Sequence, residues 1–298
     1  MSAQPQPRRV ENLHTDKGKV PVYATGIVAQ PWDGYSADDH ATWATLFRRQ
    51  REILVGRACD EFLQAQDAMG MTPHAIPKFD ELNAALGAAT GWPLLGVEGL
   101  LPELDFFDHL AHRRFPVTWW IRRPDQIDYI EEPDLFHDLF GHVPLLMNPV
   151  FADYMQAYGA GGVKAHGIGP EALQNLTRLY WYTVEFGLIR QHDGLRIYGA
   201  GIVSSTGESI HALESAAPNR IGFDAERIMR TRYRIDTYQK TYFVIDSFQQ
   251  LMDATEPDFT PIYARLASQA SIPAGDVLDT DAVVQRGSGD GWANDGDV

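Results

Sequence analysis

The segment from Leu179 to Ile189 constrains the fold more than any other part of the sequence, because it is apolar or aromatic at almost every position. A helix that is apolar on nearly all sides has to be buried. Glu185 is the only formally charged residue in this segment, and a buried carboxylate without a partner would be neutralised or strongly destabilising. The sequence therefore predicts a core helix whose one carboxylate pairs either with an arginine or with a metal cation.

Two histidines five positions apart could supply further metal ligands. His137 and His142 lie in the stretch from residue 131 to residue 144, where Pro133 suits the first turn of a helix and Gly141 suits its end. On a regular helix, side chains five positions apart diverge by roughly 140°. We therefore expect the helix to break at Gly141, so that the second imidazole turns back toward the first. Two neutral imidazoles so placed would bind a metal; two unrelated histidines are the alternative.

The two histidines and Glu185 together suggest a class of site. Two histidines and one carboxylate form the facial triad of non-haem ferrous oxygenases, which leaves coordination positions open for oxygen. The zinc-protease pattern H-E-x-x-H is absent from the sequence, which disfavours a hydrolase. The stretch 196–205 contains Gly199 and Gly201 but matches neither a dinucleotide-binding motif nor a serine-nucleophile motif. We expect only a turn there, in which the backbone closely approaches another segment.

The rest of the chain predicts an α+β fold, predominantly helical, in a single domain with small β elements. A helix is expected from Ser36, which forms a capping box with Asp39, and after a break at Gly56 a second one is expected from Ala58 to Met69. Further helices are expected at 79–89, 102–113, 148–158, 170–190, 223–231 and 247–253, and short strands at 116–121, 195–198 and 242–245. We expect a flexible segment at 1–30, one ordered domain at 31–270 and an acidic, Gly- and Asp-rich flexible tail at 271–298.

Composition narrows the possible partners. The chain has 40 acidic and 25 basic residues and a formal net charge of -15, and such a surface repels nucleic-acid backbones and anionic lipids. Cys59 is the only cysteine, which excludes an intrachain disulfide and a multi-cysteine metal site. No apolar run reaches the ~20 residues that span a bilayer, and the first residues lack the apolar stretch of a secretory signal. We therefore expect a cytoplasmic protein that acts on small molecules, without nucleic-acid or membrane partners.

Three stretches taken together resemble the aromatic amino acid hydroxylase family, and the resemblance is closest to its short bacterial members. The stretches are Glu132-Pro133-Asp134 with His137 and Gly141 to Leu145, then Tyr180 to Leu188, and then Tyr198 to Gly201 with Ser204 and Ser205. They occur in the family's order, and the resemblance extends from about Pro31 to about Asp258. Three separate motifs in one order make the resemblance specific.

The resemblance implies a fold, an activity and cofactors. It implies a single catalytic domain of this family's type, which binds ferrous iron and a tetrahydropterin (tetrahydrobiopterin or a related pterin) and hydroxylates L-phenylalanine to L-tyrosine with dioxygen. The regulatory domain and the tetramerising helix of animal members have no counterpart in this sequence, which implies a monomer. The alternatives are a tryptophan or tyrosine hydroxylase of the same family, a zinc hydrolase with the same ligands, and an inactive pterin-binding protein.

The resemblance also implies roles for individual residues. The metal ligands would be His137, His142 and Glu185. The pterin would lie along a loop, stack on an aromatic ring and lie near two further side chains, which implicates Gly99, Leu100, Leu101, Phe106, Asp138 and Tyr180. Arg122 would bind the substrate carboxylate, and the substrate pocket would be formed by Pro133, Trp181, Phe186, Gly201 and Ser204. Asp138 and Ile130 stand where animal members often have Glu and Thr, so details of these contacts differ from those members.

Overall fold

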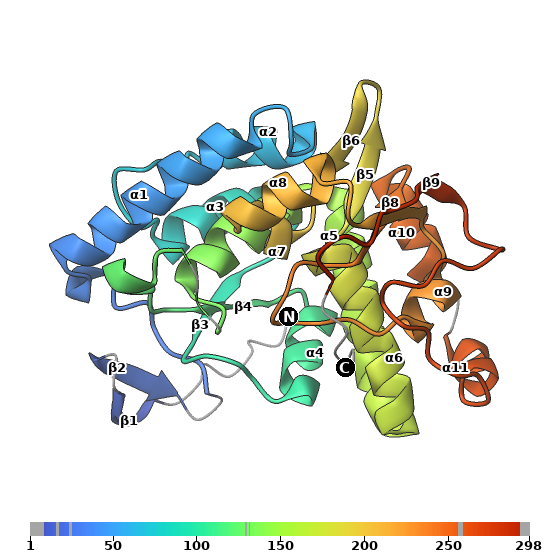
Figure 1. Ribbon diagram of the computed structural model, residues 1–298. Helices are drawn as coiled ribbons and strands as arrows, with labels where there is room; N and C mark the ends of the chain where they lie inside the picture. Colours follow the sequence, from blue (N-terminus) through green and yellow to red (C-terminus); the bar gives the residue numbers. More distant parts are fainter. Residues whose placement is uncertain are drawn as a thin grey trace.

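Helices form most of the secondary structure in the computed structural model, which describes residues 9–15, 18–23, 26–128, 130, 132–255 and 259–292 (Figure 1). The α-helices are α1 (Ala37–Leu54), α2 (Asp60–Ala68), α3 (Phe79–Ala89), α4 (Glu103–Ala111), α5 (Pro149–Ile168), α6 (Pro170–Tyr180), α7 (Ala200–Val203), α8 (Thr206–Glu214), α9 (Ala225–Arg230), α10 (Phe248–Thr255) and α11 (Thr260–Leu266). Two π-helical turns lie at His137–His142 and Trp181–Glu185, and short 3-10 turns lie at Trp32–Gly34, Pro124–Gln126 and Val143–Met147.

The strands of the described residues form three small sheets. β1 (Arg9–Thr15) pairs antiparallel with β2 (Gly18–Tyr23), and β3 (Leu94–Val97) pairs parallel with β4 (Phe115–Thr118). The third sheet has the order β6-β5-β8-β7-β9 and consists of β5 (Leu188–Gln191), β6 (Gly194–Ile197), β7 (Asn219–Gly222), β8 (Thr241–Ile245) and β9 (Val283–Gln285). Its three inner strands run parallel, and both edge strands pair antiparallel. The expected α+β fold, mainly helical with small β elements, is confirmed.

Local sequence determines where the first helices begin and end. The Ser36 hydroxyl accepts a hydrogen bond from the Asp39 N–H, and the Asp39 carboxylate accepts one from the Ser36 N–H, which is the expected capping box. Gly56 and Gly70 follow the ends of α1 and α2 and have positive φ, a conformation that favours glycine. The expected helices in this region are confirmed. The helices expected at 79–89, 102–113, 223–231 and 247–253 correspond to α3, α4, α9 and α10.

Other elements differ from the expectation in length or type. The helix expected at 148–158 continues to Ile168, and the one expected at 170–190 ends earlier, in a π-helical turn followed by β5. An apolar run without a clear period fits a buried strand as well as a buried helix, which is why the sequence pattern misses β5. The strands expected at 116–121, 195–198 and 242–245 overlap β4, β6 and β8, whereas β1, β2, β3, β7, β9, α7, α8 and α11 have no counterpart among the expected elements.

The long helix α5 forms the centre of the helical part and packs against α4, α6 and α10 (Figure 1). Two glycines of α5 allow this packing. A Cβ at Gly162 would overlap the ring of Phe107 in α4, and one at Gly159 would overlap the backbone of Ala111. Because glycine has no Cβ, the two helices can touch along their backbones. This contact places α4, which carries the expected pterin-stacking residue Phe106, beside the centre of the fold.

The segment expected to be flexible at 1–30 is only partly described. Residues 9–15 and 18–23 form the β1–β2 hairpin, although no strand period is evident in their sequence. Val28 is buried, and its N–H donates to the Gly96 carbonyl of β3 at 2.8 Å. The expectation of flexibility is therefore wrong for residues 26–30. Residues 1–8, 16, 17, 24 and 25 lie outside the described residues.

Residues 271–292 are ordered, so the flexible tail expected from residue 271 is wrong for this part of the chain. β9 extends the third sheet by pairing with β7. Ile272 is buried, and Trp292 packs against Gly275, where a Cβ would overlap the indole ring. Residues 293–298 lie outside the described residues.

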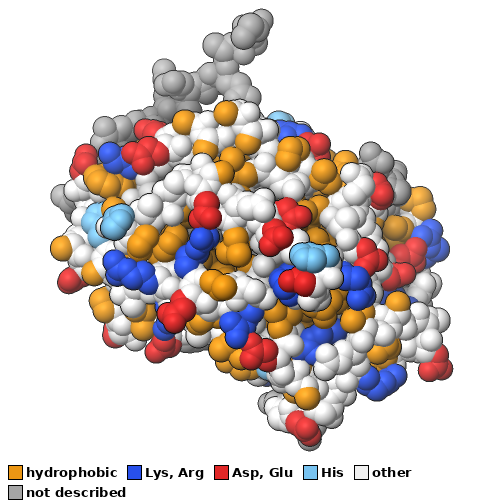
Figure 2. Space-filling view, turned by 90° about the horizontal axis from the view of Figure 1, so that it is seen from above, with side chains coloured by type: hydrophobic (Ala, Val, Ile, Leu, Met, Phe, Trp, Pro, Cys, Tyr) orange, Lys and Arg blue, Asp and Glu red, His pale blue; other side chains and the backbone are white. Residues whose placement is uncertain are grey.

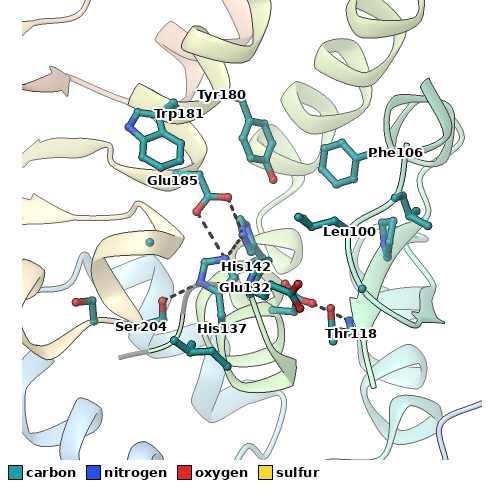
Figure 3. A pocket seen from close by; sticks show the side chains of 18 of the residues that line it. Leu100, Phe106, Thr118, Glu132, His137, His142, Tyr180, Trp181, Glu185 and Ser204 are labelled. Atoms are coloured by element: carbon teal, nitrogen blue, oxygen red, sulfur yellow. Dashed lines mark hydrogen bonds and ion pairs between the residues drawn. The ribbon is translucent and has the colours of Figure 1, made fainter. Parts of the chain in front are cut away.

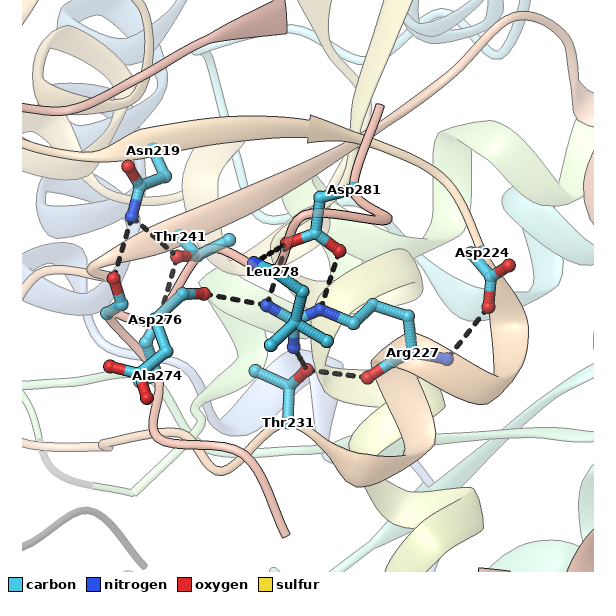
Figure 4. Close-up of polar contacts among 10 residues, drawn as sticks. Asn219, Asp224, Arg227, Thr231, Thr241, Ala274, Asp276, Leu278 and Asp281 are labelled. Atoms are coloured by element: carbon cyan, nitrogen blue, oxygen red, sulfur yellow. Dashed lines mark hydrogen bonds and ion pairs between the residues drawn. The ribbon is translucent and has the colours of Figure 1, made fainter. Parts of the chain in front are cut away.

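A buried ion pair explains how an acidic segment can dock. Asp281 accepts a hydrogen bond from Arg227 Nε at 2.8 Å, and the two side chains are only 3% and 6% exposed. The same guanidinium donates to Thr231 Oγ1 and to the Asp276 carbonyl (Figure 4). Composition does not reveal this role, because the arginine that compensates Asp281 lies 54 positions earlier in the chain.

Charged side chains of both signs are interspersed over the face shown in Figure 2, without one broad patch of either sign. The net charge of -15 is therefore not concentrated on this face. Among the helices in the described ranges, none combines the length and the hydropathy needed to cross a membrane.

We predict that Asp281→Ala lowers the free energy of unfolding by about 3–5 kcal/mol, because it leaves the buried Arg227 guanidinium without its counter-ion. Asp290→Ala, at an exposed position of the same segment, is the control and should change stability by less than about 0.5 kcal/mol. Urea denaturation monitored by circular dichroism measures both. Equal, small changes in the two variants would show that the Asp281–Arg227 ion pair does not contribute to stability.

Candidate active site

A cavity of about 530 Å³ opens beside the two π-helical turns, which is the size of a small-molecule site. Every site residue expected from the sequence lines it. These residues are Gly99, Leu100, Leu101, Phe106, Arg122, Pro133, His137, Asp138, His142, Tyr180, Trp181, Glu185, Phe186, Gly201 and Ser204. The structure therefore brings together side chains from four separated parts of the sequence.

The first π-helical turn brings the two histidines together. Its hydrogen bond runs from the Val143 N–H to the Asp138 carbonyl, five residues earlier. This wider turn places His137 and His142 on the same side, which a regular helix would not do. The expected break at Gly141 is therefore wrong, because Gly141 lies inside a continuous turn.

The second π-helical turn carries Glu185. The Phe186 N–H donates to the Trp181 carbonyl at 2.8 Å, again across five residues. The turn follows directly after α6 and precedes β5, so it ends the helix that sequence analysis extends to residue 190. Such turns occur often at functional sites, and here each of them presents an expected metal ligand to the cavity.

Glycines allow α7 to approach both turns. A Cβ on Gly141 would lie 2.9 Å from the Ala200 carbonyl oxygen, and one on Gly199 would overlap the Glu185 carbonyl group. Any larger residue would therefore push the segments apart. The expected turn with close backbone approach at Gly199 is confirmed, and the segment it approaches is the one that carries Glu185.

The three expected metal ligands converge (Figure 3). The Nε2 atoms of His137 and His142 are 3.0 Å apart. Glu185 places Oε2 3.7 Å from Nε2 of His137 and Oε1 3.1 Å from Nε2 of His142. Two imidazole nitrogens and a carboxylate that face one point are a donor set suited to a divalent transition metal.

Ser204 determines which nitrogen of His137 is available. The Ser204 hydroxyl donates to the Ala200 carbonyl at 2.7 Å, so its oxygen must accept from Nδ1 of His137, which lies 2.9 Å away. A histidine that carries its proton on Nδ1 has a free lone pair on Nε2. The atom that faces Glu185 and His142 is therefore the one able to bind a metal.

The charge states also suit a metal. Burial lowers the pKa of His137 to about 4, even with Glu185 nearby, so this imidazole is neutral. Burial opposes the charge of His142 and of Glu185, but their mutual attraction outweighs it, raising the pKa of His142 and lowering that of Glu185. The negative charge of Glu185 would stabilise a metal cation in the same way that it stabilises a charged His142.

Asp138 lies beside this cluster but is engaged elsewhere. His137, Asp138 and His142 each offer a ligand atom, and these atoms lie within 4.8 Å of one another. However, Asp138 Oδ2 accepts a hydrogen bond from the buried Thr118 N–H at 2.7 Å, and burial raises the pKa of this carboxyl to about 7. Glu185 is anionic and lies closer to both imidazoles, so it fits a cation better than Asp138 does.

A buried ion pair connects the histidines to Arg122. Nε and Nη2 of Arg122 donate to the two carboxylate oxygens of Asp134, each at 2.9 Å, and Asp134 also accepts from the His137 N–H at 3.0 Å. The forked contact orients the guanidinium. Two of its three nitrogens are used in this way, and the third, Nη1, is the one that could bind a substrate carboxylate.

Phe106 and Leu100 border one side of the cavity (Figure 3). Phe106 meets Tyr180 edge to face, with ring centroids 5.8 Å apart. Leu100 is 79% exposed, so it offers apolar surface at the cavity edge. A flat ligand lying along residues 99–101 would cover Leu100 and could stack on Phe106.

Trp181 and Phe186 border another side, with ring centroids 4.6 Å apart. Tyr233 stacks on Trp181 at 4.3 Å and an interplanar angle of 16° and also lines the cavity. Sequence analysis does not find Tyr233, because the loop that carries it has neither a periodic pattern nor a motif. Thr118, Glu132 and Thr206 likewise line the cavity without having been expected.

A sequence model of the biopterin-dependent aromatic amino acid hydroxylases matches residues 25–262. The chain belongs to this family. The phenylalanine-4-hydroxylase of Ralstonia nicotianae is 65% identical over 269 residues, which cover 90% of this chain and 85% of that one. That of Chromobacterium violaceum is 62% identical over 269 residues, which cover 90% of each chain. The resemblance inferred from the three motifs is confirmed.

The fold of this hydroxylase also matches a solved structure. The crystal structure of the Chromobacterium violaceum phenylalanine hydroxylase with bound Fe(III) superimposes with a TM-score of 0.85 at 62% identity, covering 87% of this chain and 94% of that one. Iron and a pterin are the groups on which the family's chemistry depends. The donor set, its charge states and the exposed Leu100 all fit these groups.

Another buried carboxyl of the hydroxylase, that of Glu208 in α8, lies behind the cavity wall. It accepts hydrogen bonds from the Gln239 N–H, at 3.1 Å, and from the Tyr242 hydroxyl. Burial raises the pKa of Glu208 to about 7, although these hydrogen bonds oppose the shift. Between the ordinary pKa, about 4.5, and this value, the folded state binds more protons than the unfolded state, so stability falls as the pH rises.

We predict that the wild-type enzyme loses about 3 kcal/mol of stability through Glu208 as the pH rises from 5 to 8. In Glu208→Gln, which keeps an acceptor oxygen but cannot ionise, this loss should be absent. Glu171→Gln, at an exposed position of α6, is the control and should keep the wild-type profile. Urea denaturation at four pH values measures the profiles, and a profile unchanged in Glu208→Gln would contradict the prediction.

Proposed function

We propose that the protein is a phenylalanine 4-monooxygenase that converts L-phenylalanine to L-tyrosine with dioxygen and a tetrahydropterin at a non-haem ferrous iron. The observation that carries this proposal is the convergence of two imidazole Nε2 atoms and one carboxylate at an aromatic-walled cavity. Three protein ligands leave coordination positions open for oxygen. The names and the 65% and 62% identities of the two relatives support the same activity.

His137, His142 and Glu185 would hold the iron, which supplies the activation of dioxygen together with the pterin when both are bound. The protein's own contribution is to prepare the ligands. Ser204 keeps the proton of His137 on Nδ1, and Asp134 holds the backbone of His137. Such contacts orient the ligand atoms toward the proposed metal position.

The pterin would lie along Gly99, Leu100 and Leu101 and stack on Phe106, since flat heterocycles stack well on aromatic faces. Asp138 and Tyr180 line the cavity between this loop and the metal ligands. The hydrogen bond from the Thr118 N–H fixes the position of the Asp138 carboxyl relative to the proposed pterin loop and to the proposed metal ligands.

The amino acid would bind on the other side of the cavity. Nη1 of Arg122 would bind its carboxylate, and the guanidinium is already oriented by Asp134. The ring would lie among Pro133, Trp181 and Phe186, with Gly201 and Ser204 completing the pocket. None of the three ring-facing side chains is charged, which suits a phenyl ring.

This wall favours phenylalanine over the other aromatic amino acids. Tyrosine would bring a hydroxyl group and tryptophan an indole N–H, each of which costs about 1–3 kcal/mol if buried without a partner. Tryptophan is also larger, and packed pockets tolerate added volume poorly. A zinc hydrolase with the same ligands is disfavoured by the match of the whole domain to the pterin-dependent family.

We further propose that the enzyme acts in the cytoplasm as a monomer on small molecules, without nucleic-acid or membrane partners. The net charge of -15 supports a monomer without nucleic-acid partners, because a charge far from zero opposes self-association and binding to polyanions. Size-exclusion chromatography with light scattering tests the oligomeric state.

We predict that a mixture of phenylalanine, tryptophan and tyrosine at equal concentrations, with ring-labelled phenylalanine, Fe(II) and a tetrahydropterin, yields mainly labelled tyrosine. 5-Hydroxytryptophan should form slowly and dihydroxyphenylalanine more slowly still. Mass spectrometry of the products measures this, and omission of the pterin is the control. If another product dominates, the enzyme has the activity of a different member of the family. If oxygen uptake does not depend on the pterin, the proposal is rejected.

We predict that Glu185→Gln lowers the affinity for iron by more than ~100-fold, because it removes the only anionic ligand of the proposed set. Asp138→Asn is the matched control, since it neutralises the neighbouring carboxyl and should retain iron. Iron content after dialysis measures both, together with tyrosine formed per pterin consumed. Iron retained in Glu185→Gln and lost in Asp138→Asn would show that Asp138 is the ligand.

A further inference from the structure

Gln239 lies behind the aromatic wall of the cavity, just before β8. It is 3% exposed and is not among the residues that line the cavity. Its Oε1 accepts a hydrogen bond from the indole N–H of Trp181 at 2.9 Å. Gln239 therefore contacts the proposed substrate pocket only through Trp181.

The fold determines how the Gln239 carboxamide is oriented. Its Nε2 donates to the Arg234 carbonyl at 3.0 Å and is 3.4 Å from the Thr237 carbonyl. Because carbonyl oxygens can only accept, the NH₂ group must face them and the oxygen must face Trp181. The backbone N–H of Gln239 donates to buried Glu208, which holds the residue from a third direction.

The indole of Trp181 is held by rings on both sides and by this one hydrogen bond. Tyr233 stacks on it at 4.3 Å, and the Phe186 ring lies 4.6 Å away. Ring contacts restrict the distance of the indole but allow it to slide and rotate in its own plane. The directional bond to Gln239 removes this freedom.

We propose that Gln239 is a positioning and specificity-determining residue, which fixes the position of the Trp181 indole within its plane and occupies the only polar hydrogen among the side chains of Pro133, Trp181 and Phe186. This inference rests on the proposed function and extends it. With its N–H occupied from behind, Trp181 offers no donor to a ring hydroxyl. The pocket therefore accepts a phenyl ring and discriminates against tyrosine.

Two substitutions of nearly equal size separate this role from a merely structural one. Gln239→Met and Gln239→Glu both lose the NH₂ group that faces the Arg234 and Thr237 carbonyls, so both should lower the melting temperature. Only Gln239→Met also loses the acceptor for the Trp181 N–H. We expect Gln239→Met to raise KM for phenylalanine about tenfold with less than a twofold change in KM for the tetrahydropterin. Gln239→Glu should keep KM for phenylalanine within about threefold of wild type.

Substrate choice and a double-mutant cycle give further readouts. In Gln239→Met the freed N–H can donate to a ring hydroxyl, so the ratio of kcat/KM for tyrosine to that for phenylalanine should rise about tenfold. In a Trp181→Phe background, which has no indole N–H, Gln239→Met should leave KM for phenylalanine unchanged. Calorimetric titration of the iron-loaded enzyme with phenylalanine, without oxygen, measures affinity independently of turnover.

The outcomes distinguish the two proposals. If the wild-type enzyme forms no tyrosine, the proposed function fails and this inference fails with it. If it does, an unchanged KM in Gln239→Met, an equal KM increase in Gln239→Glu, or an equal increase in the Trp181→Phe background overturns the inference alone. Should Gln239→Met not fold, Trp181→Phe replaces it, since it loses the same hydrogen bond while Gln239 stays intact. An unchanged affinity for phenylalanine in Trp181→Phe also overturns the inference.

Discussion

The negative charge of Glu185 is placed where only 15% of its side chain is exposed, and the centre of this hydroxylase is built around that placement. A carboxylate in such a position needs a positive or hydrogen-bonding partner. His137 and His142 supply it, and a ferrous ion bound among the three would supply it more fully. The surrounding backbone serves to bring these groups together and to keep the imidazole lone pairs available.

Regular helices could not make this arrangement. Side chains five positions apart on an α-helix point in different directions, whereas a π-helical turn brings His137 and His142 to one side. The second such turn follows α6 directly and carries Glu185, which lines the cavity. Both turns pack closely against α7, which glycine at 141 and at 199 permits. Backbone irregularity is thus concentrated where the ligands are.

Support for the site comes from parts of the chain that lie far from the ligands in sequence. Ser204, 67 positions after His137, orients its imidazole, whereas Asp134, only three positions before it, holds its backbone and the guanidinium of Arg122. The loop that precedes β8 supplies Gln239 behind Trp181. β8 in turn belongs to the sheet that the C-terminal segment completes through β9. The acidic C-terminal segment therefore belongs to the same framework as the cavity wall.

The sequence by itself determined the family and indicated the chemistry of the proposed site. A single charge in an apolar run, two histidines and three ordered motifs were sufficient, because ligand identity and burial are properties of short segments. The capped helix at Ser36 and most helix positions could be predicted for the same reason. The expected site residues also all line one cavity.

Only the tertiary structure decided the features that depend on contacts between distant segments. A π-helical turn, packed against α7, replaces the break expected at Gly141. Residues 271–292 are ordered, and Asp281 in this segment pairs with Arg227, which lies 54 positions earlier in the chain. The role of Gln239 also depends on the tertiary structure, because its loop has no sequence pattern and its contact with Trp181 exists only in the fold. Local sequence cannot report such pairings, since each partner's environment exists only after the chain has folded.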